Sequence, residues 1–121
     1  MKLTYFAHRY NAPTFQESQD NWVRAWDRLT QLQPLLEKAG EHLWAPWLDL
    51  ASVFRSERLA WPVITAAIQA SDCVLLDLDG APASPGMERE RAIATEAGVE
   101  VVEFGIDSQQ VVDQQPEEST T

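Results

Sequence analysis

The sequence predicts a three-layer α/β fold: a parallel twisted sheet of about four to five strands with helices on both faces, as in flavodoxin-like and Rossmann-like domains. Two observations predict this class. Short apolar segments alternate along the chain with segments of helical periodicity, which is typical of a parallel sheet joined by crossover helices. Residues 73–78 are largely apolar, as in a strand that is covered on both faces. With 121 residues, the chain has room for one core.

The first strand is expected at Leu3–Ala7, and a polar loop follows it to about Asp20. An amphipathic helix then ends near Gly40, a natural residue to close a helix. Its apolar residues recur at helical spacing, at Trp22, Trp26, Leu29, Leu32 and Leu36. Pro34 lies inside this pattern and cannot donate a backbone hydrogen bond. We therefore expect it to kink the helix or split off its last turn.

The middle of the chain predicts a second strand and further helices. A short strand is expected at His42–Ala45, and Pro46–Leu50 is expected to be irregular. A short helix is expected within residues 51–60. Pro62 suits the first turn of a helix that runs to about Ala70, because an N–H group is unpaired there anyway. The residues expected to face inward from this helix are Val63, Ala67 and Ile68.

The last strand–helix–strand unit is the most clearly marked in the sequence. A strand is expected at Cys73–Leu78, and turn-forming residues occupy 79–86. A helix at about 87–97 leads to the last strand, Val99–Phe104. The signals at the two ends of this helix are the N-cap Ser84, Pro85 at the first helical position and Gly98 after the last turn.

The composition indicates one domain and an acidic tail. Residues 1–106 form the expected domain. Residues 107–121 are mostly Gln, Asp, Glu, Ser and Thr, which predicts a disordered tail. The formal net charge of −10 opposes the phosphates of a nucleic-acid polymer, so none is expected as a partner. A single phosphorylated ligand is compatible with this charge, because local backbone dipoles can outweigh a global field.

The sequence does not indicate a membrane span, a disulfide or a metal site. No apolar run is long enough to span a bilayer, and the first residues are too polar for a secretory signal, so a cytoplasmic protein is expected. The one cysteine, Cys73, allows no internal disulfide and is expected to be a buried structural thiol. Neither a dinucleotide fingerprint nor a phosphate-loop lysine motif occurs. Neither a metal nor a cofactor is expected.

The loop that enters the last helix is the expected ligand site. In parallel sheets, ligands bind beyond the carboxyl ends of the strands, and one such end leads into this loop. Gly86 permits a close approach of the backbone, and Ser84 adds a hydroxyl. The free N–H groups of the first turn can then hold a phosphate or a sugar hydroxyl. Glu90 lies about one turn further along and can act on an attached sugar as nucleophile or base. The alternative is a solvated charged face that Glu90 shares with Glu88 and Arg89.

Other polar and aromatic residues are candidates for ligand contacts. His8 and Arg9 follow the first strand, so His8 can meet a ligand and Arg9 can pair with a phosphate or lie free on the surface. Asp77 and Asp79 lie near the end of the third strand, and Asp79 is the one expected to face the cleft. Three tryptophans can stack on a base or form core, namely Trp44, Trp47 and Trp61.

One motif resembles a known family. An apolar strand leads into Ser84-x-Gly86-x-x-x-Glu90-x-Ala92-x-Ala94-x-x-x-Gly98. This motif resembles the nucleoside 2-deoxyribosyltransferase-like superfamily, which includes deoxynucleoside 5′-monophosphate N-glycosidases and small uncharacterised bacterial and phage proteins. The resemblance extends from about Leu3 to Phe104. It implies that Glu90 is a nucleophile toward the anomeric carbon, that Ser84 contacts phosphate and that Tyr5 lines the nucleoside pocket. It also implies a homo-oligomer.

The chain departs from this family at two places. The characterised enzymes carry an aspartate that assists the leaving base, whereas residues 61–66 at that place contain no acid. Asp49 or Glu57 are possible substitutes. Residues 8–11 also replace a loop in which glycine and serine are common, so nucleotide specificity cannot be carried over.

Three functions are compatible with these patterns. The leading one is hydrolysis or transfer at an N-glycosidic bond of a nucleoside or nucleotide, with Glu90 as nucleophile. The second, suggested by the missing aspartate, is a non-catalytic module of the same fold that binds nucleotides or a partner. The third is hydrolysis of a dinucleotide such as NAD, which also requires a glutamate at a ribose.

Overall fold

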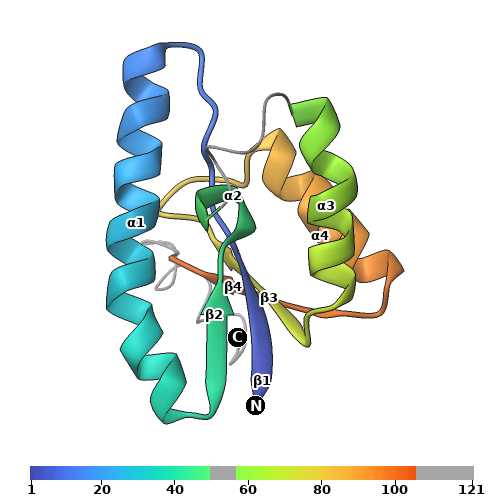
Figure 1. Cartoon of the computed structure of the whole chain (residues 1–121). Coiled ribbons are helices and arrows are strands. Elements are labelled where there is room, and N and C mark those ends of the chain that lie inside the picture. Colours follow the sequence, from blue (N-terminus) through green and yellow to red (C-terminus); the bar gives the residue numbers. More distant parts are fainter. Residues whose placement is uncertain (50–56, 106–121) are drawn as a thin grey trace, which may run out of the picture.

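A computed structural model describes residues 1–49 and 57–105 of the chain (Figure 1). Within these residues one sheet contains four parallel strands, in the order β2-β1-β3-β4. The strands are β1 (Lys2–Ala7), β2 (Glu41–Trp44), β3 (Cys73–Asp77) and β4 (Glu100–Phe104). Each lies within one residue of its expected bounds at either end. The helices of the described residues are α1 (Phe15–Lys38), α2 (Pro46–Asp49), α3 (Glu57–Gln69) and α4 (Pro85–Glu96). None of them is both long and apolar enough to cross a membrane.

Helices cover both faces of the sheet, which confirms the predicted three-layer α/β class. Helix α1 lies on one face, and α3 and α4 lie side by side on the other (Figure 1). Neighbouring residues of β1 point to opposite faces, so Tyr5 packs toward α3 and α4 while Phe6 packs toward α1. Two apolar clusters result, one on each face of the sheet. Cys73 is buried, as expected.

Helix α1 is longer than the sequence analysis predicts. It begins at Phe15, whereas a loop was expected to about Asp20. Thr14 caps it by accepting a hydrogen bond from the backbone N–H of Glu17 at 3.1 Å. The spacing of these two residues is that of a capping box, so the signal was present in the sequence. The expected split at Pro34 is wrong, because the helix continues through this exposed residue to Lys38. Gly40 follows the helix at φ 79° and ends it as expected.

The segment before β3 also differs from expectation. A short helix, α2, replaces the irregular stretch expected at Pro46–Leu50. Helix α3 already includes Glu57, so Pro62 lies inside the helix and not in its first turn. Val63 is 44% exposed and does not face inward, whereas Ala67 and Ile68 are buried as expected. Residues 50–56 and 106–121 lie outside the described residues, and with them much of the helix expected at 51–60 and the acidic tail.

Candidate active site

Glu90 is buried on the inner face of α4. The helix begins as expected, with Ser84 as N-cap accepting a hydrogen bond from the N–H of Met87 at 3.3 Å, and with Pro85 in the first turn. Glu90 shares its face with buried Met87, and only 2% of it is exposed. Glu88 and Arg89 are exposed. The solvated-face alternative therefore describes Glu88 and Arg89 but is wrong for Glu90.

Two side chains donate hydrogen bonds to the Glu90 carboxyl. The Tyr5 hydroxyl, at the centre of β1, donates to Oε2 at 2.5 Å. The Trp47 indole, on α2, donates to the same oxygen at 3.0 Å. Both of these hydrogen bonds are accepted by Oε2. The carboxyl is therefore held in one orientation by groups from two other elements.

Burial sets the charge state of this cluster. Loss of solvent raises the pKa of Glu90 to about 8, and the hydrogen bonds from Tyr5 and Trp47 oppose that rise. Burial, and then the charge of Glu90, raise the pKa of Tyr5 well above its usual value. Tyr5 therefore stays a neutral donor, while Glu90 gains or loses its proton near neutral pH. Such a carboxyl can act as a nucleophile or as an acid and base.

Trp47, which donates to Glu90, packs among other aromatic rings. Trp47 packs against both apolar clusters, and its ring centroid lies 5.4 Å from that of Trp61 and 6.3 Å from that of Tyr10. Trp61 is buried in the core and carries the Arg89 guanidinium over its ring at 4.0 Å. The indole of Trp44 donates to Ser71, away from Glu90. Of the three tryptophans singled out in the sequence, only Trp47 has a hydrogen bond to Glu90 among the described contacts.

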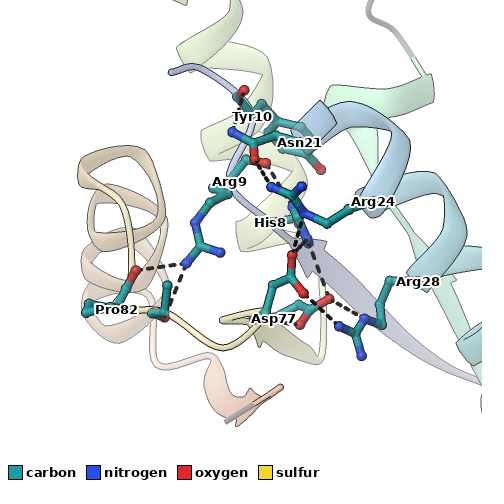
Figure 2. A network of polar contacts seen from close by, with 10 residues as sticks. His8, Arg9, Tyr10, Asn21, Arg24, Arg28, Asp77 and Pro82 are labelled. Carbon is teal, nitrogen blue, oxygen red and sulfur yellow. Dashed lines mark hydrogen bonds and ion pairs between the residues drawn. The ribbon is translucent and has the colours of Figure 1, made fainter. Parts of the chain in front are cut away.

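A second polar network lies on the α1 face at the ends of β1 and β3 (Figure 2). His8 is 1% exposed, and its Nε2 lies 3.8 Å from Asp77 and 3.6 Å from Asp79. Arg28 bridges both acids, at 3.2 Å from Asp77 and 2.9 Å from Asp79. Arg24 lies 2.9 Å from Asp79. Burial lowers the pKa of His8 and raises that of Asp77, and the neighbouring opposite charges counter both shifts. The network joins the carboxyl ends of two strands to α1.

Arg9, Ser84 and Gly86 occupy the loops near these strand ends. Arg9 donates from Nη2 to the backbone carbonyls of Ala81 at 3.2 Å and Pro82 at 2.8 Å, which ties the loop after β1 to the loop after β3 (Figure 2). Gly86 is exposed, and an added Cβ there would have no heavy atom within 4 Å. Gly86 therefore leaves its side of the first turn of α4 uncovered by other residues.

Four of the predicted site residues meet in two pairs. Tyr5 and Glu90 meet directly, whereas His8 and Asp79 meet in the α1-face network. Asp77, which was passed over in favour of Asp79, lies in that network too and is fully buried. Asp49, a proposed substitute for the missing leaving-group acid, is exposed on α2, and the side chain of Glu57 lies outside the described part.

Several contacts were not predicted from the sequence. The hydrogen bond from Trp47 to Glu90 spans 43 positions, and no local pattern marks it. Arg24 and Arg28 occur one helical turn apart, which places both on one face of α1, but their acidic partners become visible only when α1 docks on the sheet.

Comparison with known proteins bears on the fold. No family model and no curated protein sequence matches the chain. Among solved structures, the chain is similar to a CMP N-glycosidase, BcmB, from Clostridium botulinum, with a TM-score of 0.54 and 20% identity over 84% of this chain and 70% of that one. It is also similar to a conserved protein from Enterococcus faecalis V583, with a TM-score of 0.55 and 23% identity over 97% and 76%. The fold is thus the one that the sequence resemblance implied.

Proposed function

We propose that this chain cleaves or transfers at an N-glycosidic bond of a nucleoside or nucleotide, with Glu90 as the nucleophile. The observation that carries the proposal is the buried Glu90 carboxyl, held through one oxygen by Tyr5 and Trp47. The fold shared with a CMP N-glycosidase supports the substrate class. The uncovered backbone at Gly86, in the first turn of α4 beside Ser84, suits a phosphate or a sugar hydroxyl.

The proposed reaction has two balanced steps. Oε1 of ionised Glu90 bonds to the anomeric carbon, and the electron pair of the broken C–N bond leaves with the base. Water then adds its hydroxyl to that carbon, which releases the Glu90 carboxylate, and the remaining proton goes to the base. Transfer replaces water by a second base. Tyr5 and Trp47 orient the carboxylate in both steps.

The remaining predicted site residues have positioning roles in this proposal. His8, Arg9 and Asp79 hold the loops after β1 and β3, which flank the proposed sugar position. The expected partner is a small-molecule nucleoside or nucleotide. Assembly into a homo-oligomer and a cytoplasmic location remain predictions.

The decisive experiment is an assay of base release. Wild-type protein and Glu90→Gln are incubated with ribo- and deoxyribonucleosides and their 5′-monophosphates, and free base is followed by chromatography. We expect release from at least one substrate, and a loss of at least about a thousandfold in Glu90→Gln because the nucleophile is gone. Glu88→Gln, an exposed glutamate of the same helix, is the matched control and should keep wild-type activity.

Two results would count against catalysis. Equal release by wild type and Glu90→Gln would remove Glu90 from the reaction. Thermal stabilisation by nucleotides without any base release would favour the non-catalytic binding module, which the absence of an acid in residues 61–66 motivates.

Trp47→Phe is expected to shift the pH dependence of activity toward alkaline pH. Only ionised Glu90 is nucleophilic, so kcat/KM of the wild type should rise with pH until about 8. The Trp47 hydrogen bond lowers the pKa of Glu90, and its loss raises that pKa further. Activity at pH 7 then falls tenfold for each unit by which the pKa rises. The indole of Trp44 donates to Ser71 and not to Glu90, so Trp44→Phe should keep the wild-type pH profile. An unchanged profile in Trp47→Phe would contradict the positioning role.

A further inference from the structure

Tyr10, just after β1, has a buried hydroxyl without a hydrogen-bond partner among the described residues. The residue is only 8% exposed. The other tyrosine of the chain, Tyr5, uses its hydroxyl to hold Glu90. Burying a hydroxyl without a partner is unfavourable, so such a group in a folded protein calls for an explanation. A bound ligand that accepts its hydrogen bond supplies one.

The surroundings of Tyr10 fix the position of this hydroxyl. Its ring centroid lies 4.6 Å from that of Trp22 and 6.0 Å from that of His8. Its backbone carbonyl accepts a hydrogen bond from the Asn21 amide of α1 at 3.2 Å (Figure 2). The side chain is thus held between α1 and the end of β1, and a donor held in this way needs little reorganisation to meet a ligand.

Tyr10 and Glu90 approach the same place from opposite faces of the sheet. Tyr10 belongs to the apolar cluster on the α1 face, whereas Glu90 extends from α4 on the other face. Trp47 contacts both, through its ring toward Tyr10 and its indole N–H toward Glu90. In the proposed reaction the sugar lies against Trp47, with Glu90 on one side and Tyr10 on the other. This is the arrangement that displacement at an anomeric carbon requires of nucleophile and leaving base.

The Tyr10 hydroxyl keeps its proton at neutral pH. Burial raises the pKa of Tyr10 well above its usual value, and the charges of Glu90, Asp49 and Asp77 act in the same direction. The phenol is therefore available as a hydrogen-bond donor. Asp49 is exposed on α2, and residues 61–66 contain no acid, so neither supplies a buried acid on this side of Glu90.

We infer that the Tyr10 hydroxyl donates a hydrogen bond to the departing base, an assignment that rests on the proposed glycosidic chemistry. As the C–N bond breaks, its electron pair passes to the base, and negative charge gathers on the acceptor next to the glycosidic nitrogen. This acceptor is O2 of a pyrimidine or N3 of a purine. The Tyr10 O–H stabilises that charge without losing its proton, and the water of the second step supplies the proton that the free base finally carries.

The test compares two leaving bases in Tyr10→Phe. One substrate is the nucleotide that the wild type cleaves best, and the other is a 7-methylguanine nucleotide, whose cationic base departs as a neutral molecule. Tyr10→Phe should slow release from the first by about a hundredfold and release from the second by less than about threefold. Tyr5→Phe is the matched comparison, because it removes the same kind of atom but acts on the nucleophile. It should slow both substrates to a similar extent.

Each outcome decides for or against the assignment. Equal slowing of both substrates by Tyr10→Phe, or slowing of neither, overturns it while leaving Glu90 as nucleophile. No release from either substrate by the wild type overturns the proposed function itself, and the assignment with it. Thermal unfolding gives an independent reading. Removing an unpartnered buried hydroxyl should leave the melting temperature of Tyr10→Phe equal to or above that of the wild type, and a marked fall would show that the hydroxyl serves the fold.

Discussion

As pH rises from 4 to 9, the free energy of unfolding of Glu90→Gln should increase by about 5 kcal/mol relative to that of the wild type. Burial raises the pKa of Glu90 from 4.5 to about 8. Between pH 4.5 and about 8, the folded protein therefore keeps the proton of the Glu90 carboxyl, whereas the unfolded chain has released it. The stability linked to this proton is fully present below about pH 4.5 and is lost as pH rises through about 8. Glutamine keeps the shape of the side chain and does not titrate.

Urea unfolding of both proteins at intervals between pH 4 and 9 measures this difference directly. Contributions from all other titrating groups cancel between two proteins that differ at one residue. Glu96→Gln, which changes an exposed glutamate near the end of the same helix, is the matched control, and its curve should run parallel to that of the wild type. Parallel curves for Glu90→Gln would mean that the Glu90 carboxyl is solvated in solution. This measurement needs no substrate, so it tests the burial of Glu90 apart from the proposed reaction.

The fold was largely predictable because its signals are local. Strand bounds follow from short apolar segments, and α4 follows from Ser84, Pro85 and Gly98 at its ends. The errors occur where propensity competes with packing. Pro34 costs α1 one backbone hydrogen bond, a local loss that docking along the sheet outweighs. Pro62 is likewise tolerated inside α3, where Ile64 and Ile68 are buried against the sheet.

The candidate site was predictable in part. The spacing of Ser84, Gly86 and Glu90 marks the loop, and the resemblance pairs Glu90 with Tyr5, 85 positions away. The burial of Glu90 could not be read from its charged neighbours, because it depends on how α4 is rotated against the sheet. Trp47 is a similar case. Its indole reaches Glu90 only because α2 places it beyond the end of β2.

The charged residues near the strand ends illustrate the same limit. His8, Arg9 and Asp79 each have the chemistry of a ligand contact, and the sequence shows no internal partner for them. In the fold Arg9 and Asp79 bond to other parts of the protein, and the ring of His8 lies 3.6 Å from Asp79. Such pairs join segments that are far apart in sequence, so they depend on strand order and helix docking. Ligand-binding roles for these three residues remain predictions.

Gly105→Ala should destabilise the protein by about 3 to 5 kcal/mol. Gly105 follows β4 at φ 81°, a left-handed conformation that costs an alanine free energy by itself. The added Cβ would also overlap Oδ1 of Asp77 and lie 2.7 Å from the backbone nitrogen of Asp79. Neither atom can yield easily, because Asp77 is fully buried and both acids are bridged by Arg28. The methyl group must therefore displace backbone at the carboxyl end of β3.

Gly98→Ala separates the two contributions to this loss. Gly98 has nearly the same backbone conformation, with φ 75°, but an added Cβ there would have no heavy atom within 4 Å. It should cost about 1 kcal/mol, the conformational penalty alone. Chemical denaturation of both variants and the wild type gives the two losses under identical conditions. The difference between them measures how firmly the Asp77–Asp79 turn is held by its ion pairs. If Gly105→Ala costs no more than Gly98→Ala, the turn yields freely and the network does not fix the loop beside the candidate site.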